Sequence, residues 1–130
     1  MSPPLLLDTQ LVLWVALAPQ RLRAATRRVV ESRSRAVAFS DASLWEVAIK
    51  SSLGRPDFSV DARALRDGLV AAGFEEWPIR AEHLFEVGRL AWHHRDPFDR
   101  LLVAQAAVEK AQLLTADATL RAYGRHVRVA

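Results

Sequence analysis

The fold is decided by residues 96–115, which read DPFDRLLVAQAAVEKAQLLT. Asp96 is a good helix N-cap, a proline follows it at the preferred first helical position, and Asp99 adds negative charge in the first turn, where the helix dipole favours it. From Leu101 to Ala111 the sequence is apolar on nearly every side of a helix, so we expect this helix to be buried between a sheet and other helices. Residues 112–115 then predict a short buried strand.

The rest of the chain alternates short apolar strands with helical stretches. This alternation is typical of βαβ units, and it predicts a parallel sheet that is covered on both faces. The predicted strands are 5–7, 36–39, 74–79, 112–115 and 127–129, and the predicted helices are 9–17, 19–35, 42–53, 62–72, 80–92, 97–111 and a short one that ends near residue 123.

Length and composition place the chain among ordinary single-domain proteins. It has 130 residues, of which 51% are hydrophobic and 25% charged, and it contains no cysteine. Disulfide scaffolds, thiolate zinc sites, iron–sulfur clusters and cysteine nucleophiles are therefore excluded. The sequence lacks an apolar run of membrane-spanning length, and its first residues do not resemble a signal peptide, so we expect a cytoplasmic protein with no membrane partner.

The charge balance is modestly basic. Eighteen lysines and arginines face fifteen acidic residues, and only two of the eighteen are lysines. The net charge of +3 and the isoelectric point near 10.2 fit a polyanionic partner such as RNA. Codon usage in a GC-rich genome explains the arginine excess equally well, so the position of the charges is more informative than their sum.

Four acidic residues from separate stretches are predicted to meet at one edge of the sheet. Asp8 ends the first strand and Asp117 follows the strand 112–115, while Glu46 and Asp99 lie on helices beside them. Ligands bind beyond the carboxyl ends of parallel strands. Carboxylates about 4 Å apart repel by ~4 kcal/mol at an effective dielectric near 20, so such a cluster needs protons or a cation. Oxygen ligands without cysteine favour Mg²⁺ or Mn²⁺ over zinc.

Simpler interpretations remain open for several of these residues. Asp8 fits a helix N-cap as well as a ligand, and Asp96 fits a cap better than a ligand. Glu46 stands in an apolar helix, where a carboxylate is costly unless it is paired or metal-bound. His93 and His94 read as a surface turn and as poor zinc ligands.

Four sequence blocks resemble the PIN-domain ribonuclease toxins of the VapC type. The resemblance extends from Leu5 to the end of the chain, and its most specific part is HRDPFDRLLVAQA at 94–106. The other blocks are LLLDT at 5–9 with the Leu-Trp pair at 13–14, SLWEVAIK at 43–50, and LTAD at 114–117.

The resemblance implies a single PIN domain over residues 1–130, with a doubly wound α/β/α sandwich and a mainly parallel central sheet. It also implies a metal-binding acidic quartet for one or two Mg²⁺ or Mn²⁺ ions. The implied quartet is Asp8, Glu46, Asp99 and Asp117, with Asp96 as an additional candidate and Thr9 and Thr115 as supporting residues. Many relatives carry histidine where this chain has Gln10, and an amide cannot shuttle protons near neutral pH.

The function implied by the resemblance is that of a toxin in a toxin–antitoxin pair. Such proteins are metal-dependent endoribonucleases that use a metal-activated water, cut exposed loops of tRNA, rRNA or mRNA, commonly form homodimers, and are inhibited by a cognate antitoxin. The candidate phosphate contacts are Arg27, Arg28, Lys50, Arg95 and Arg100, although a solvated helix surface explains the first two slightly better.

Two other functions compete with this interpretation. One is a catalytically inactive PIN-fold module that binds RNA or protein. The other is a phosphatase of another doubly wound family, which usually needs a second aspartate two residues after the first; Gln10 occupies that position here and disfavours it.

Overall fold

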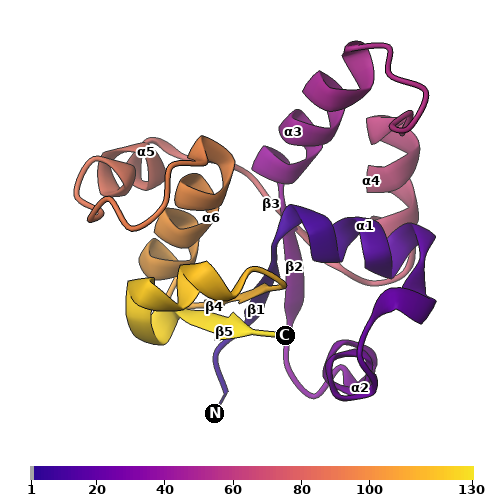
Figure 1. The fold of residues 1–130 in the computed structure, drawn as a ribbon. Helices are drawn as coiled ribbons and strands as arrows, with labels where there is room; N and C mark the ends of the chain where they lie inside the picture. Colours follow the sequence, from indigo (N-terminus) through magenta and orange to yellow (C-terminus); the bar gives the residue numbers. More distant parts are fainter. Residues whose placement is uncertain (1) are drawn as a thin grey trace.

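A twisted sheet of five strands lies at the centre of the protein (Figure 1). The structure is a computed structural model that describes residues 2–130. The strand order is β3-β2-β1-β4-β5, and every neighbouring pair is parallel, so the predicted α/β/α sandwich is confirmed. The strands are β1 (Leu5–Leu7), β2 (Val37–Ser40), β3 (Glu75–Trp77), β4 (Gln112–Thr115) and β5 (Val127–Val129).

The chain winds outward from β1 in one direction and then in the other. It passes from β1 through β2 to β3, and it later returns beside β1 as β4 and continues to β5. The two halves therefore meet between β1 and β4, where Leu6 pairs with Leu113. Ligands of doubly wound sheets bind at such a switch point, beyond the carboxyl ends of the strands.

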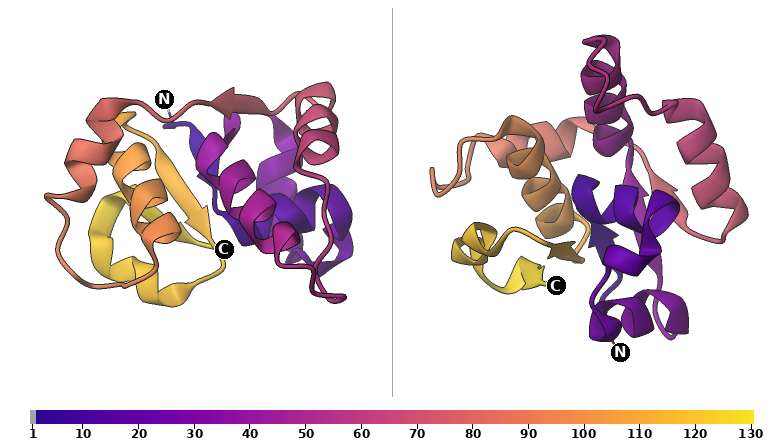
Figure 2. Two further views of the ribbon diagram at one scale, coloured as in Figure 1. Left: turned by 90° about the horizontal axis from the view of Figure 1, so that it is seen from above. Right: turned by 45° about the vertical axis from the view of Figure 1, so that its right-hand side comes forward.

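Helices cover both faces of the sheet, as the two views in Figure 2 show. Leu5 and Leu7 pack on one side with residues of α1, α2 and α4, whereas Leu6 packs on the other with α6 and the last 3₁₀ segment, η2. The helices are α1 (Thr9–Leu17), η1 (Pro19–Arg21), α2 (Ala24–Ser32), α3 (Asp41–Ser52), α4 (Ala62–Ala71), α5 (Ala81–Val87), α6 (Pro97–Val108) and η2 (Ala118–His126).

The strand β1 explains why the sheet needs two covering layers. All three of its leucines are fully buried, and successive side chains of a strand point to opposite faces. A strand that is apolar at every position is stable only when helices exclude water from both sides. The buried helix α6 supplies the cover on one side, since Leu101 through Ala106 are all buried.

Several helices begin at residue types that are typical N-caps. Ser40, Asp61, Asp96 and Asp117 each accept a backbone N–H at the start of a helix. Asp96 caps α6 through Phe98 and Asp99, as predicted. The chain leaves α4 through Gly73, whose φ of +93° favours glycine.

Four predicted elements have the wrong extent. The helix expected over 97–111 ends at Val108. The helix expected over 19–35 is interrupted, because Leu22 and Arg23 are extended; Leu22 and α2 pack against the same core. The strand expected over 74–79 is shorter because Pro78 cannot donate to a neighbouring strand. The helix expected over 80–92 ends at Val87.

Carbonyls at and beyond the end of α5 accept from a side chain as well as from the backbone. Arg100 donates to the carbonyl oxygens of Val87 and Ala91, so those acceptors are satisfied without further helical turns. None of the helices in residues 2–130 has the length and hydropathy required to cross a membrane.

Candidate functional site

A pocket with an acidic lining opens at the carboxyl ends of β1 and β4. Its volume is about 450 Å³, and it contains all five carboxylates singled out in the sequence. We call it the acidic pocket. Its lining residues are Asp8, Thr9, Gln10, Leu13, Glu46, Lys50, Phe58, Asp96, Asp99, Ala116 and Asp117.

Asp8 is the most firmly held of the acids. Its Oδ1 accepts from the backbone N–H of Leu11 at 2.8 Å, and its Oδ2 accepts from the Thr115 hydroxyl at 2.5 Å and from Ala116 N–H at 3.2 Å. Asp8 therefore caps α1 and also joins β1 to β4. Burial raises the pKa of Asp8, and these hydrogen bonds oppose that rise.

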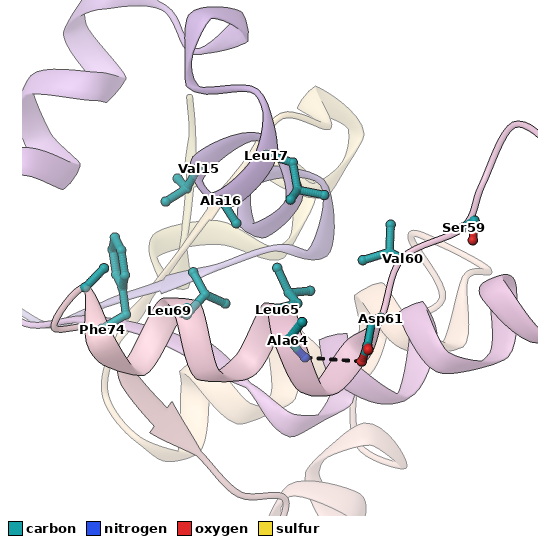
Figure 3. A pocket seen from close by; sticks show the side chains of 12 residues that line it. Val15, Ala16, Leu17, Ser59, Val60, Asp61, Ala64, Leu65, Leu69 and Phe74 are labelled. Carbon is teal, nitrogen blue, oxygen red and sulfur yellow. Dashed lines mark hydrogen bonds between the residues drawn. The ribbon is translucent and has the colours of Figure 1, made fainter.

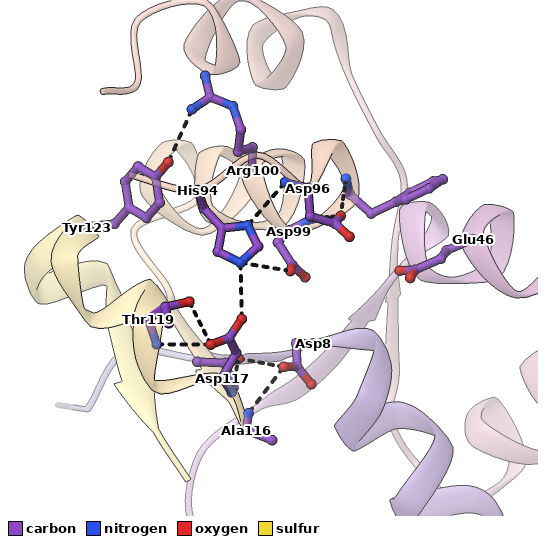
Figure 4. A network of polar contacts seen from close by, with 12 residues as sticks. Asp8, Glu46, His94, Asp96, Asp99, Arg100, Ala116, Asp117, Thr119 and Tyr123 are labelled. Carbon is purple, nitrogen blue, oxygen red and sulfur yellow. Dashed lines mark hydrogen bonds and ion pairs between the residues drawn. The ribbon is translucent and has the colours of Figure 1, made fainter. Parts of the chain in front are cut away.

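A hydroxyl pair fixes α3 beside α1. Thr9 Oγ1 lies 2.9 Å from Ser43 Oγ, and both side chains are buried. This contact places the start of α3 against the start of α1, so Glu46, one turn after Ser43, lies across the pocket from Asp8 (Figure 4). Thr9 contacts Ser43, and Thr115 contacts Asp8; their supporting roles stay a prediction, and Ser43 is a partner that the sequence did not predict.

Glu46 has one satisfied oxygen and one unsatisfied oxygen. Its Oε2 lies 2.7 Å from Lys50 Nζ, whereas its Oε1 is buried without a hydrogen-bond partner among residues 2–130. A buried carboxylate oxygen without a partner is costly. Figure 4 shows the Glu46 carboxylate directed toward the other acids, which is where a cation would supply the missing interaction.

The charged form of Asp99 is strongly disfavoured in the pocket. Burial, followed by repulsion from Asp96, Asp8 and Glu46, raises the pKa of Asp99 to about 7, and the nearby His94 partly offsets that rise. A carboxylate that resists ionisation because of its neighbours is a good place for a divalent cation, which removes the repulsion.

Asp117 is stabilised in its charged form. Its Oδ1 accepts from both the hydroxyl and the N–H of Thr119, at 2.6 and 2.9 Å, and its Oδ2 lies 3.1 Å from His94 Nε2. The hydroxyl of Thr119 is the largest cause of the lowered pKa of Asp117, and His94 contributes to it.

The expectation that His94 lies in a surface turn is wrong. Its side chain is only 20% exposed, and Nε2 also lies 3.8 Å from Asp99. The sequence places His94 two residues before the N-cap Asp96, and this position puts it beside the start of α6, near Asp99. His94, Asp99 and Asp117 offer polar atoms within 4.8 Å of one another.

Arg100 is not available to bind phosphate. Its side chain is buried and donates to the carbonyls of Val87 and Ala91 and to the Tyr123 hydroxyl. Its guanidinium also lies 3.9 Å from the centre of the Trp92 ring. Arg100 therefore serves the fold, and its assignment as a phosphate contact is corrected.

The other basic candidates differ in their distance from the acids. Lys50 lines the acidic pocket, and Arg95 is exposed in the segment just before α6. Arg27 and Arg28 are exposed on α2, and Arg27 pairs with Glu31. Among the described residues that line the pocket, none comes from α2.

A second cavity, of about 420 Å³, lies between α1 and α4 (Figure 3). Its lining is mostly aliphatic, and its single acid, Asp61, is already used as the N-cap of α4. This cavity offers no catalytic chemistry.

The acidic pocket, in contrast, presents carboxylate oxygens, which are the ligands that hard divalent cations prefer. The residues that could hold such a cation are Asp8, Glu46, Asp99, Asp117 and Asp96.

The sequence was compared with models of known protein families, and one of them matches most of the chain. The family model of the PIN domain matches residues 5–126. The chain belongs to the PIN domain family. The resemblance noted in the sequence is thereby confirmed, and the acidic pocket of this PIN domain lies where the fold places a ligand site.

Solved structures with the same fold include several toxin–antitoxin complexes. VapBC2 from Rickettsia felis, bound to a promoter DNA fragment, is 16% identical with a TM-score of 0.70 over 98% of this chain and 97% of that one. A toxin–antitoxin complex from Klebsiella pneumoniae is 16% identical with a TM-score of 0.63, covering 95% and 94%. VapBC-5 from Mycobacterium tuberculosis is 21% identical with a TM-score of 0.56, covering 98% and 97%. A search of curated proteins found no match.

We predict that Asp99→Asn stabilises the metal-free protein at high pH. The pKa of Asp99 is raised from 3.8 to about 7, so ionising this group costs the folded state stability as pH rises through that interval. In EDTA at pH 8 the variant should be more stable than wild type by about 1 kcal/mol or more, or roughly 4 °C in Tm. At pH 4 the difference should largely vanish.

Thermal unfolding followed by circular dichroism measures both conditions. Asp57→Asn removes an exposed acid elsewhere and serves as the matched control. Equal Tm values for wild type and Asp99→Asn at pH 8 would contradict the electrostatic strain assigned to this site.

Replacing Arg100 should destabilise the fold. Arg100→Ala removes one of the two donors to each of the carbonyls of Val87 and Ala91. It also removes the packing on Trp92, so we expect a loss of roughly 2–4 kcal/mol. Urea unfolding checks this value, with the exposed Arg95→Ala as the control that should behave like wild type. A wild-type midpoint for Arg100→Ala would show that the contact network does not support the fold.

Proposed function

We propose that this PIN domain is the toxin of a toxin–antitoxin pair and acts as a Mg²⁺- or Mn²⁺-dependent endoribonuclease. The observation that carries the proposal is the acidic pocket, in which five carboxylates share one space and Glu46 Oε1 has no partner within residues 2–130. Asp99, whose pKa is raised to about 7, is fully ionised at neutral pH only when a cation offsets the neighbouring charges.

The ligand assignment follows from the contacts of each acid. Asp8, Glu46, Asp99 and Asp117 would hold the cation, with Asp96 contributing its free oxygen, since Oδ1 already caps α6. When bound, the cation lowers the pKa of a coordinated water and makes hydroxide available for attack on a phosphodiester. Thr115 and Thr119 keep Asp8 and Asp117 in fixed orientations, so these carboxylates need little reorganisation.

Lys50 and Gln10, which also line the pocket, would bind the phosphates of the substrate. Lys50 already neutralises one oxygen of Glu46, and its ammonium lies where a phosphate would approach. Gln10 also lines the pocket. Its amide is able to hydrogen-bond a phosphate or a water, but it does not exchange protons, so no acid–base step is assigned to it.

The partners follow from the family and its structural neighbours. An antitoxin partner is supported by solved relatives that are VapBC complexes, and FitAcB from Neisseria gonorrhoeae shares the fold with a TM-score of 0.62 at 17% identity. We propose a cognate antitoxin, an RNA loop of tRNA, rRNA or mRNA as substrate, a homodimer, and action in the cytoplasm.

The nuclease proposal predicts that loss of a ligand carboxylate abolishes cleavage. Asp8→Asn and Asp99→Asn keep the shape of the side chain but remove its charge, so each should lower the rate by a factor on the order of 100 or more. The assay is cleavage of total bacterial RNA with Mg²⁺ or Mn²⁺, compared with an EDTA blank.

Asp57→Asn, an exposed acid outside the pocket, should cleave like wild type. Equal cleavage by wild type and both pocket variants would indicate a contaminating nuclease and overturn the site. RNA that wild type binds without cutting would instead favour the inactive binding module.

The arginines of α2 supply a separate prediction about RNA binding. If Arg27 and Arg28 contact phosphates, Arg27→Ala/Arg28→Ala should weaken binding and reduce the slope of log K against log salt by about 1.4, or roughly 0.7 per phosphate on a single strand. Binding is measured on the Asp99→Asn background to prevent cleavage.

Arg63→Ala/Arg89→Ala is the matched control, because it removes the same charge from exposed positions on α4 and beyond α5. Equal effects of the two double variants would show that only net charge matters and would reject a phosphate track on α2.

A further inference from the structure

The ring of His94 is fixed by a hydrogen bond at each nitrogen. Its Nδ1 lies 3.1 Å from the backbone N of Asp96, and its Nε2 lies 3.1 Å from Asp117 Oδ2. A backbone N–H is always a donor, so Nδ1 must accept and cannot carry a proton. In the neutral ring the proton is then on Nε2, and it is donated to Asp117.

This tautomer conflicts with metal coordination by His94. A ligating histidine offers a lone pair to the metal and usually donates the N–H of its other nitrogen to a carbonyl or carboxylate. Here the nitrogen that faces Asp99 and Asp117 carries the proton, and the other nitrogen accepts from Asp96. Coordination through Nε2 would move the proton to Nδ1, directly against the N–H of Asp96.

Asp117 is more exposed than Glu46 and Asp99, so its orientation depends more on hydrogen bonds from neighbouring side chains. Its side chain is 39% exposed, compared with 8% for Glu46 and 23% for Asp99. Thr119 holds Oδ1 and His94 holds Oδ2. Without the His94 contact, Thr119 alone would hold Asp117, through Oδ1, and Oδ2 would lose its donor.

The segment that carries His94 is itself anchored. Residues 88–96 form turns and bends between α5 and α6, and Arg100 and the Tyr123 hydroxyl both donate to the carbonyl of Ala91. His93 packs edge-on against the Tyr123 ring, with centroids 5.0 Å apart. These contacts hold the backbone on the N-terminal side of His94, and the Asp96 N–H holds the ring on the other.

We propose that His94 is a positioning residue that orients Asp117 through Nε2–H and is not a metal ligand, so the acidic pocket binds its cation through oxygen atoms alone. The inference rests on the proposed metal-dependent function. It adds that the sequence block 94–99 supplies both a candidate ligand, Asp99, and the group that aims a second candidate ligand, Asp117.

Two substitutions separate the two hydrogen bonds of His94. In His94→Gln the side-chain amide reaches about as far as Nε2 and can still donate to Asp117. In His94→Asn the side-chain oxygen occupies the region of Nδ1 and can still accept from Asp96, but the shorter amide does not reach Asp117. Both variants should fold, which thermal unfolding in EDTA checks.

The decisive measurement is Mn²⁺ affinity, determined by calorimetry or by the electron paramagnetic resonance of free Mn²⁺. We expect His94→Asn to weaken binding by about 10–100-fold, and His94→Gln to restore it to within about threefold of wild type. Wild-type affinity in His94→Asn would overturn the positioning role, and weak binding in both variants would point to coordination by the ring.

The tautomer is tested independently of any metal affinity. Long-range ¹H–¹⁵N spectra of the metal-free protein should show His94 protonated on Nε2 and unprotonated on Nδ1, and addition of diamagnetic Mg²⁺ should leave that pattern unchanged. Loss of the Nε2 proton on adding Mg²⁺, or a proton on Nδ1, would overturn the proposal. Absence of Mn²⁺ binding by wild type would instead count against the proposed metal-dependent function, and the spectra would still decide the role of His94.

Discussion

The mutual repulsion of carboxylates at one edge of the sheet is the constraint on which the functional part of this protein depends. Asp8, Asp99 and Glu46 raise one another's energy when charged, and Asp99 shows it most clearly, with a pKa of about 7. The surrounding fold keeps these groups together with neutral donors. Backbone N–H groups, the Thr115 hydroxyl and one histidine N–H stabilise the carboxylates. Among the described residues, Lys50 is the only lysine or arginine that forms an ion pair with a pocket acid. That arrangement leaves the charge to be balanced by something that enters the pocket.

Much of this arrangement could be predicted, because residues close together in the sequence determine it. The leucines of β1, the N-cap Asp96 with its following proline, and the apolar run of α6 specify their elements through burial and capping, which depend on near neighbours. The convergence of the acids could also be predicted, since parallel strands bring their carboxyl ends to one edge. The lining of the acidic pocket agrees with that expectation, although which of these residues bind metal stays a prediction.

The failures concern contacts between residues that are distant in sequence. The sequence places Arg100 near the acids and so favours a phosphate contact, but in the fold its side chain is buried and donates to the Val87 carbonyl at the end of α5. The sequence predicts a surface turn at His94, because nothing near it in sequence indicates that Asp117, twenty-three positions later, accepts its hydrogen bond. Both residues gain their roles from the way 88–96 folds over α6 and η2, and periodicity carries no information about such a segment. The interruption at Leu22 and Arg23 is similar, since composition there favours a helix and tertiary packing overrides it.

The hydrogen bonds of Asp8 also constrain the order in which the pocket is assembled. Asp8 lies at the start of the chain, yet it is held by Thr115 and Ala116, which are 107 and 108 positions away. Closing so long a loop is entropically costly, and it gains nothing until β4 pairs with β1. A growing or truncated chain that stops before β4 can form α1 and its cap but not the pocket. The site is therefore a late product of folding, and partly folded chains do not contain it.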